Sequence, residues 1–237
     1  MTPAQFVKAL GALEFENSFN PYSNRCADHD LDDAPKRRSS SLRAMLEVAA
    51  KRDIDSIWIG RDLGYRGGRR TGLALTDDIH ISAHAQRWGV SIERPTKGEA
   101  VSERTAAVIW NVLSQVQASV FLWNVFPLHP HETDDPFSNR SHNSRERRAG
   151  EELLFQLILL LKPRRLVGIG NDAALTAYRL SYHHQVVKVR HPSYGGQTQF
   201  LKQLRELYDL FARSRSISTI AAQIRPRSVL KAGRLIK

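Results

Sequence analysis

The sequence contains a single cysteine, Cys26, and no long apolar run among its 237 residues. One thiol cannot form an intrachain disulfide, and it cannot supply the four thiolates of an iron–sulfur or zinc site. The absence of about 18 consecutive apolar residues excludes a transmembrane helix. The first residues also lack the basic and apolar regions of a signal peptide. We therefore expect a cytoplasmic protein that has no membrane partner.

Acidic residues are the scarcer charged class: 24 Asp and Glu stand against 35 Lys and Arg, for a net charge of +11. Of the basic residues 26 are Arg, whose planar fork binds phosphate at two points, although an Arg-rich genome would give the same preference. Seven basic and no acidic residues lie in 213–237. We therefore expect one folded domain over 1–212 and a basic C-terminal arm over 213–237. The charge indicates a polyanionic partner such as nucleic acid but names no reaction.

Short apolar runs alternate along the chain with segments of helical periodicity. The runs cover residues 55–60, 119–125, 166–170 and 186–189. The helical segments are 5–14, 41–52, 99–117, 146–161, 171–180 and 198–211. Uniformly apolar strands that alternate with helices are typical of a parallel sheet covered on both faces. The sequence therefore predicts a three-layer α/β/α sandwich around a central, mostly parallel four-stranded sheet.

Three polar side chains fall at the ends of these predicted strands. Asp62 follows the first strand, Asn124 ends the second and His191 follows the fourth. Because ligands bind at the carboxyl ends of the strands in such sheets, we expect the three at one edge. A carboxylate there can orient water or stabilise a cation, an amide can read a base edge, and an imidazole can donate to an oxyanion. Each also has a local alternative, as a turn carboxylate, a strand cap or an ordinary polar contact.

The segments around these residues resemble the uracil-DNA glycosylase superfamily in order and spacing, over residues 40–210. The resemblance rests on GRDLGYRGGRRTG at 60–72, on the strand that ends in Asn124 and on His-Pro-Ser at 191–193. It implies a monofunctional hydrolase that flips uracil out of DNA and cleaves its N-glycosidic bond, leaving an abasic site. It also implies a single- or double-stranded DNA substrate and no metal or organic cofactor, and we expect a monomer.

The resemblance further implies a role for individual residues. Asp62 would stabilise the sugar cation and position the attacking water, His191 would stabilise negative charge on uracil O2, and Asn124 would bind the uracil edge. The other expected substrate contacts are Gly60, Arg61, Leu75, Tyr65 and Ser193. The expected DNA contacts are Arg66, Arg69, Arg70, Tyr194, Gly195 and Gln197. Among the latter, the arginines would contact phosphates, and Tyr194 or Gln197 would fill the gap left by the flipped base.

The sequence departs from the family at two positions of the base pocket. Leu75 takes the place of an aromatic residue that stacks on the base, which makes Phe19 or Tyr22 a candidate substitute. Tyr65 lies three residues after Asp62, whereas the family's tyrosine that helps to exclude thymine lies two residues after its aspartate. Two other functions therefore stay open. One is a glycosylase of the same fold for hypoxanthine, xanthine or mismatched thymine, and the other is a DNA-binding module that recognises damage without catalysis.

Two further patterns do not predict a site. His129, His131, Glu132 and His142 fall in one polar loop, but no tight metal-ligand spacing relates them, and we interpret them as solvated loop residues. GIGN at 168–171 lacks the full dinucleotide fingerprint, so no nicotinamide site is predicted. The sequence therefore predicts one site, at the carboxyl edge of the sheet.

Overall fold

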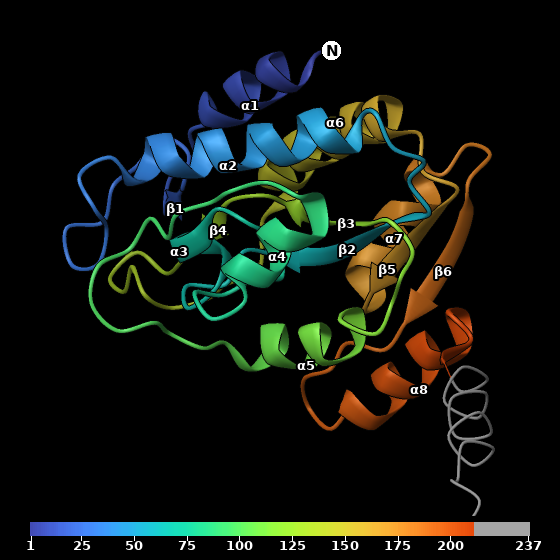
Figure 1. The fold of residues 1–237 in the computed structure, drawn as a ribbon. Coiled ribbons are helices and arrows are strands. Elements are labelled where there is room, and N and C mark those ends of the chain that lie inside the picture. The colour runs from blue at the N-terminus through green and yellow to red at the C-terminus, as the bar shows by residue number, and fades with distance from the viewer. Residues whose placement is uncertain (211–237) are drawn as a thin grey trace, which may run out of the picture.

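Four parallel strands form the centre of the protein in a computed structural model that describes residues 1–210 (Figure 1). The strands are β2 (Ser56–Asp62), β3 (Val120–Phe126), β5 (Arg165–Ile169) and β6 (Gln185–Val189). They pair in the order β3-β2-β5-β6, and the bounds of each lie within two residues of the predicted run. The predicted four-stranded parallel sheet is therefore confirmed, while the basic arm predicted at 213–237 lies outside the described residues.

Helices cover both faces of this sheet and give the expected three layers. They are α1 (Pro3–Gly11), α2 (Ala34–Ala49), α3 (Gly68–Thr71), α4 (Ile81–Trp88), α5 (Arg104–Leu113), α6 (Ser144–Leu161), α7 (Asn171–Leu180) and α8 (Gln197–Leu207). In Figure 1, α1, α2 and α6 lie above the sheet and α5 and α8 below it. Ile57 and Ile59 of β2 accordingly pack in the core with α1, α2 and α6, whereas Trp58 packs in the core with α5 and α8. Burial on both faces explains why the strands are apolar throughout.

Helix α2 begins at Ala34 rather than at residue 41, where the apolar pattern begins. The additional turns are polar in sequence, yet Arg38 within them is fully buried. Its guanidinium forms an ion pair with Asp30 and donates to the backbone oxygen of Arg70 at 2.8 Å. A buried ion pair thus takes the place of an apolar contact, and a hydrophobic pattern does not reveal such a contact.

Several short elements escape the sequence pattern. α3 and α4 lie between the predicted strand at 55–60 and the predicted helix at 99–117, where no helix is predicted, and α5 is shorter than that predicted helix. β1 (Ser18–Phe19) and β4 (His129–Pro130) form a two-stranded antiparallel sheet, whose strands are too short to show alternation. Because α3 follows β2 and β4 follows β3, both short elements belong to the carboxyl edge of the sheet.

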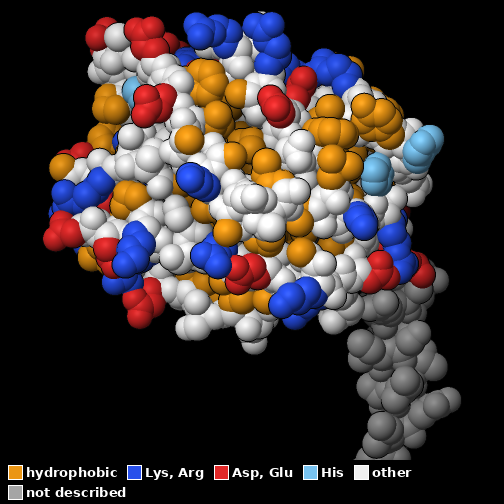
Figure 2. Space-filling model, turned by 90° about the horizontal axis from the view of Figure 1, so that it is seen from above, with side chains coloured by type: hydrophobic (Ala, Val, Ile, Leu, Met, Phe, Trp, Pro, Cys, Tyr) orange, Lys and Arg blue, Asp and Glu red, His pale blue; other side chains and the backbone are white. Residues whose placement is uncertain are grey.

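Charged side chains are mixed on the face formed by α1, α2 and α6. Figure 2, which views the molecule from that side, shows Lys and Arg interspersed with acidic and hydrophobic side chains. Residues 1–210 contain 28 basic and 24 acidic residues, so the domain itself is weakly basic. In this part of the chain no helix has both the length and the hydrophobicity to cross a membrane. The helical face in Figure 2 therefore offers a polyanion no continuous basic patch.

Candidate active site

A cavity of about 540 Å³ opens at the carboxyl ends of β2, β3 and β5. Its lining includes Asp62, Asn124 and His191, the three side chains that the strand ends predict at one edge. Leu75 and Ser193, predicted as substrate contacts, line it as well. Residues far apart in the chain thus meet in one space whose volume lies in the range of ligand pockets.

Asp62 is the last residue of β2, and its carboxylate is held from two sides. Arg61 Nε donates to Oδ2 at 2.7 Å, and His142 Nδ1 forms a hydrogen bond with Oδ1. The side chain is only 6% exposed although it lines the cavity. A carboxylate fixed in this way can stabilise a cation or orient a water molecule without reorganising during the reaction.

Asn124 lies on β3 directly opposite Gly60 of β2. A Cβ atom at Gly60 would lie 2.7 Å from Asn124 Nδ2 and 2.8 Å from Leu75 Cδ2, so glycine makes room for both side chains. Asn124 Nδ2 donates to the backbone oxygen of Asp62 at 3.0 Å, while Oδ1 is buried without a hydrogen-bond partner among the described residues. Because a buried acceptor without a donor is unfavourable, this oxygen is suited to a donor on a ligand.

His191 follows β6 and is held as a neutral ring. The backbone N–H of Ser193 donates to Nδ1 at 3.2 Å, and Ser193 Oγ lies 2.7 Å from the same nitrogen. A backbone N–H can only donate, so Nδ1 is the acceptor and the ring proton is on Nε2. Burial lowers the pKa of His191, and the charges of Arg61 and Arg190 lower it further. At neutral pH the ring can therefore donate one hydrogen bond without bearing a charge.

Glu103 adds a second carboxyl group to the lining of the cavity. Gly64 and Gly67 leave space for it, since a Cβ atom at Gly64 would lie 2.8 Å from Glu103 Oε1. Burial, with a contribution from Asp77 and against the opposing charge of Arg66, raises the pKa of Glu103 to about 7. Glu103 is not predictable as a site residue from the sequence, because it stands at an ordinary helix start where no motif marks it.

Replacement of Glu103 by Gln is expected to stabilise the fold above pH 7 but not in acid. The pKa is 4.5 for an ordinary glutamate and about 7 in the folded protein, so between these values the folded state binds more protons. The free energy of unfolding of the wild type therefore falls as pH rises through this window. The Gln variant carries a neutral amide at every pH, so above pH 7 its free energy of unfolding should exceed that of the wild type by about 1 to 3 kcal/mol. Urea unfolding of the two proteins at about pH 4 and about pH 8 measures this difference in the free energy of unfolding. An equal difference at both pH values would contradict the raised pKa.

His142 belongs to this site, although the sequence analysis placed it among solvated loop residues. It precedes α6, whose start is fixed by a capping box between Asn143 and Glu146. Its side chain is 1% exposed, with Nδ1 bonded to Asp62 and Nε2 at 3.4 Å from Asp172 Oδ2. The topology of the sheet could have indicated that His142 lies at the site. A helix that connects two parallel strands begins at their carboxyl edge, so the residue before its cap lies beside the site.

The histidine-containing loop is partly buried rather than solvated. His129 lies in the interior, where Nε2 is 2.8 Å from the backbone oxygen of Ser138 and Nδ1 is 3.0 Å from Arg69 Nη1. Burial and the charge of Arg69 lower the pKa of His129 to about 3. Within residues 1–210 no three His, Cys, Asp or Glu side chains converge as a metal site would require. The interpretation as solvated residues is therefore wrong for His129 and His142.

Two of the arginines predicted to contact DNA are buried, and that prediction is wrong for both. Arg69 donates to the backbone oxygen of Pro136 at 2.8 Å, and Arg70 donates to Asp78 at 2.7 Å. A guanidinium enclosed in the fold cannot reach a phosphate. Arg66 is exposed and stays a predicted DNA contact. The cluster of arginines in the sequence thus serves mainly to hold the loop after β2.

Neither aromatic candidate for base stacking lines the cavity. Phe19 is covered by a buried guanidinium 4.0 Å from its ring centre, and Tyr22 donates to a backbone oxygen at 2.6 Å. The hypothesis that one of them replaces the family's aromatic residue is therefore wrong. Leu75 itself lines the cavity, with a left-handed backbone at φ +55°. Tyr65 is not among the described residues that line the cavity.

The mouth of the cavity bears an exposed aromatic side chain among cationic residues. Tyr194 lines the mouth and is 97% exposed, with a left-handed backbone at φ +49°. Gly195 follows it at φ +73°, and Gln197 is the exposed first residue of α8. Arg61 and Arg190 line the same mouth and are exposed. The mouth of the cavity thus presents the ring of Tyr194 and the positive charges of Arg61 and Arg190 to a ligand that enters it.

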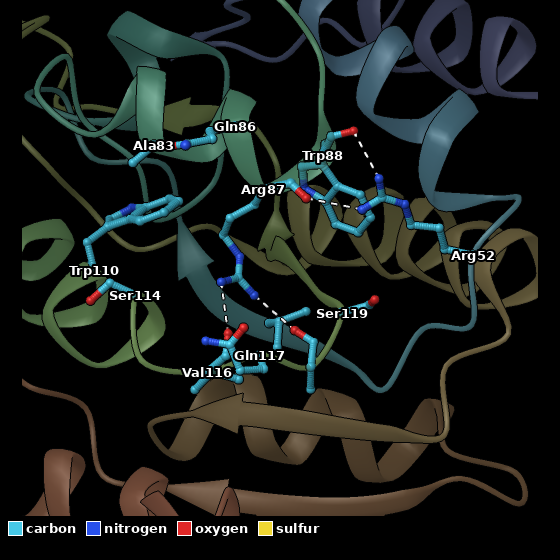
Figure 3. Close-up of a pocket in the computed structure, with 12 residues that line it drawn as sticks. Arg52, Ala83, Gln86, Arg87, Trp88, Trp110, Ser114, Val116, Gln117 and Ser119 are labelled. Carbon is cyan, nitrogen blue, oxygen red and sulfur yellow. Dashed lines mark hydrogen bonds between the residues drawn. The ribbon is translucent and has the colours of Figure 1, made fainter. Parts of the chain in front are cut away.

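A second cavity, of about 470 Å³, lies at the opposite end of β3 and lacks these features (Figure 3). Arg87 in its wall donates to the backbone oxygens of Leu113, Val116 and Ala118, and Arg52 donates to those of Arg87 and Trp88. These guanidiniums cap loop carbonyl groups. The lining in the described part of the chain contains no acidic residue and no histidine. The cavity at the carboxyl edge is therefore the candidate active site.

Comparisons with known proteins bear on the family and the fold of this chain. A family model described as the uracil DNA glycosylase superfamily matches residues 55–212, which include all three strand-end residues. Among solved structures, the crystal structure of wild-type SMUG2 from Pedobacter heparinus is similar with a TM-score of 0.54 and 12% sequence identity. The match covers 90% of this chain and 99% of that chain. No curated protein sequence matches. The structural likeness shows a shared fold.

Proposed function

The chain belongs to the uracil DNA glycosylase superfamily, and from this premise we propose that it removes uracil from DNA by hydrolysing the N-glycosidic bond. The observation that supports this most strongly is the meeting of Asp62, Asn124 and neutral His191 in one cavity. A carboxylate, a base-reading amide and a neutral donor are the three groups that this reaction needs. A module that only recognises damage would need no carboxylate beside the sugar.

Recognition of the base begins with extrusion of the nucleotide into the cavity. The unpaired Oδ1 of Asn124 then accepts a hydrogen bond from the N3–H of uracil. Cytosine has no hydrogen at N3, so it would leave this oxygen buried and unpaired, which disfavours it strongly. Leu75, on the same wall, packs against the ring.

Bond cleavage places opposite charges on the two halves of the nucleotide. The bond between C1′ and N1 breaks, its electron pair stays on uracil, and the Nε2–H of His191 donates to the negative O2. Asp62 stabilises the cation that develops on the sugar and orients a water molecule toward C1′. The water oxygen bonds to C1′ and one of its protons leaves through Asp62 to solvent. The uracil anion takes up a proton from solvent, so the products are uracil and an abasic site.

Hydrolysis by water, rather than strand cleavage through an amine, fits the composition of the site. A glycosylase that also cuts the strand uses an amine nucleophile, commonly lysine, to form a Schiff base. Among the described residues that line the cavity there is no lysine. One chain supplies every group named in this reaction, so we propose that the protein acts as a monomer. The exposed Arg61, Arg66 and Arg190 supply phosphate contacts on single- or double-stranded DNA.

Removal of the Tyr194 side chain is expected to impair excision from duplex DNA more than from single strands. An exposed ring at the mouth can fill the gap left by the flipped base, which a single strand does not have. For Tyr194→Ala we expect about a tenfold slower single-turnover rate on duplex and little change on single strands. Tyr182→Ala is the matched control, because Tyr182 is also exposed with a positive φ but precedes β6 at the other end of that strand. Equal loss on both substrates would contradict the wedge role.

A second candidate is a glycosylase of the same fold for another base. Two observations favour it: Leu75 replaces the aromatic stacking residue, and Tyr65 does not line the cavity. The test is a strand-nicking assay on matched oligonucleotides that contain uracil, mismatched thymine, hypoxanthine or xanthine, with alkali to reveal abasic sites. Cleavage at uracil supports the proposed function. Cleavage mainly at another base would keep the mechanism and change the substrate, and DNA binding without any cleavage would favour the recognition module.

A further inference from the structure

We propose that His142 is a positioning residue for Asp62, and that Asp172 in turn fixes the ring of His142. The inference rests on the proposed function, because it assigns to these residues the task of holding the carboxylate that faces the sugar. Neither residue follows from the strand-end pattern. His142 lies before α6 and Asp172 in the first turn of α7.

The backbone at His142 is rigid because the start of α6 is held firmly. Asn143 Oδ1 accepts from the backbone N–H groups of Arg145 and Glu146 at 2.9 and 3.0 Å. Glu146 is fully buried and accepts from two nitrogens of Arg140 at 2.7 and 2.8 Å. A loop residue next to such a cap has little freedom to move, so the cap restricts where its ring can lie.

The ring of His142 faces a carboxylate at each nitrogen. Nδ1 bonds to Asp62 Oδ1, and Nε2 lies 3.4 Å from Asp172 Oδ2, which is within ion-pair distance but outside hydrogen-bond geometry. Among the described residues, His142 Nε2 and Asp172 Oδ2 have no hydrogen-bond partner. Asp172 also pairs with Arg147. The ring of His142 thus lies between two carboxylates, each of which is also held by an arginine: Asp62 by Arg61 and Asp172 by Arg147.

Without His142, the carboxylate of Asp62 would be held far less firmly. Its remaining side-chain partner is Arg61, whose side chain is 48% exposed and free to turn toward a phosphate. The carboxylate must keep one orientation to stabilise the sugar cation and to direct water at C1′. A displacement of about 1 Å in such a group can lower a rate about 10²-fold. His142 therefore acts on the reaction through Asp62, without touching the substrate.

The test compares three replacements of His142 in single-turnover release of uracil and in affinity for abasic-site DNA. His142→Ala should slow release about 10- to 100-fold and change the affinity by less than about twofold. His142→Asn should restore part of the rate, because its amide nitrogen takes the place of Nδ1. His142→Gln, whose amide nitrogen takes the place of Nε2, should not. Asp172→Asn should slow release by a smaller factor than His142→Ala.

His129→Asn is the matched control, because His129 is a buried histidine of the same loop that contacts Arg69 rather than Asp62. It should lower the melting temperature but leave the rate per folded molecule unchanged. If wild type releases uracil and folded His142→Ala is within twofold of it, the inference on His142 is overturned. Equal loss in the Ala, Asn and Gln variants, together with lost DNA affinity, would show a structural role and overturn it too. If wild type releases no base from any substrate, the proposed function fails, and this inference fails with it.

Discussion

Asp62→Asn is expected to slow single-turnover release of uracil about 10²- to 10³-fold while changing DNA affinity by less than about twofold. Asparagine has the shape of aspartate, so the loop after β2 and the cavity keep their form. It lacks the charge that stabilises the sugar cation, and its single amide oxygen can accept from His142 or from Arg61 but not from both. Rapid mixing with excess enzyme measures release, and fluorescence anisotropy on abasic-site DNA measures affinity.

Asp55→Asn provides the matched control for this substitution. Asp55 immediately precedes β2 at the opposite end of the same strand, where its carboxylate pairs with Arg165 at 2.8 Å. Loss of that pair should lower stability slightly and leave the release rate per folded molecule unchanged. If Asp62→Asn weakens DNA binding as much as it slows release, the carboxylate is not catalytic. That outcome would favour a module that only recognises damage.

Replacement of His191 is expected to show that a neutral ring donates the critical hydrogen bond. His191→Ala should slow release about 10²- to 10³-fold, because the charge on uracil O2 loses its donor. His191→Gln should recover part of that loss, since its Nε2–H can occupy the position of the ring Nε2–H without bearing a charge. His184→Ala, a half-buried histidine that precedes β6, should behave as wild type.

The pH dependence of release separates a neutral donor from a charged one. The pKa of His191 is lowered from 6.5, so its ring is mostly neutral above that pH. We therefore expect His191 to cause no fall in the single-turnover rate between about pH 6.5 and about pH 8. A rate that falls tenfold per pH unit in this window for wild type, but not for His191→Gln, would show that the charged ring is the active form.

The sheet and the location of the site could be predicted from sequence because both depend on features that a sequence displays directly. The four apolar strands are buried on both faces, so each appears as a short uniform run. Helices connect the strands and make them run parallel, so their carboxyl ends put Asp62, Asn124 and His191 at the same edge. Gly60 fits the same logic, since its lack of a side chain makes room for Asn124.

What could not be predicted depends on contacts between polar residues that are distant in the chain. Arg69 and Arg70 stand in an exposed-looking basic cluster, yet their partners come from residues 136 and 78, and pairing buries them. His142 likewise becomes part of the site only because α6 begins beside Asp62. A pattern of hydrophobic residues does not reveal a buried pair of polar residues. Such residues are found by asking which loop ends the topology brings to the active edge.

The most direct test of this account is the appearance of free base from DNA that contains uracil at a single position. The purified protein is mixed in excess with the oligonucleotide, and uracil is separated by chromatography before and after alkali is added to the strand. We expect stoichiometric free uracil from an unbroken strand that alkali then cleaves at the former uracil position. Bound but unchanged DNA, or a strand cut before alkali is added, would contradict a hydrolytic site built from Asp62, Asn124 and His191.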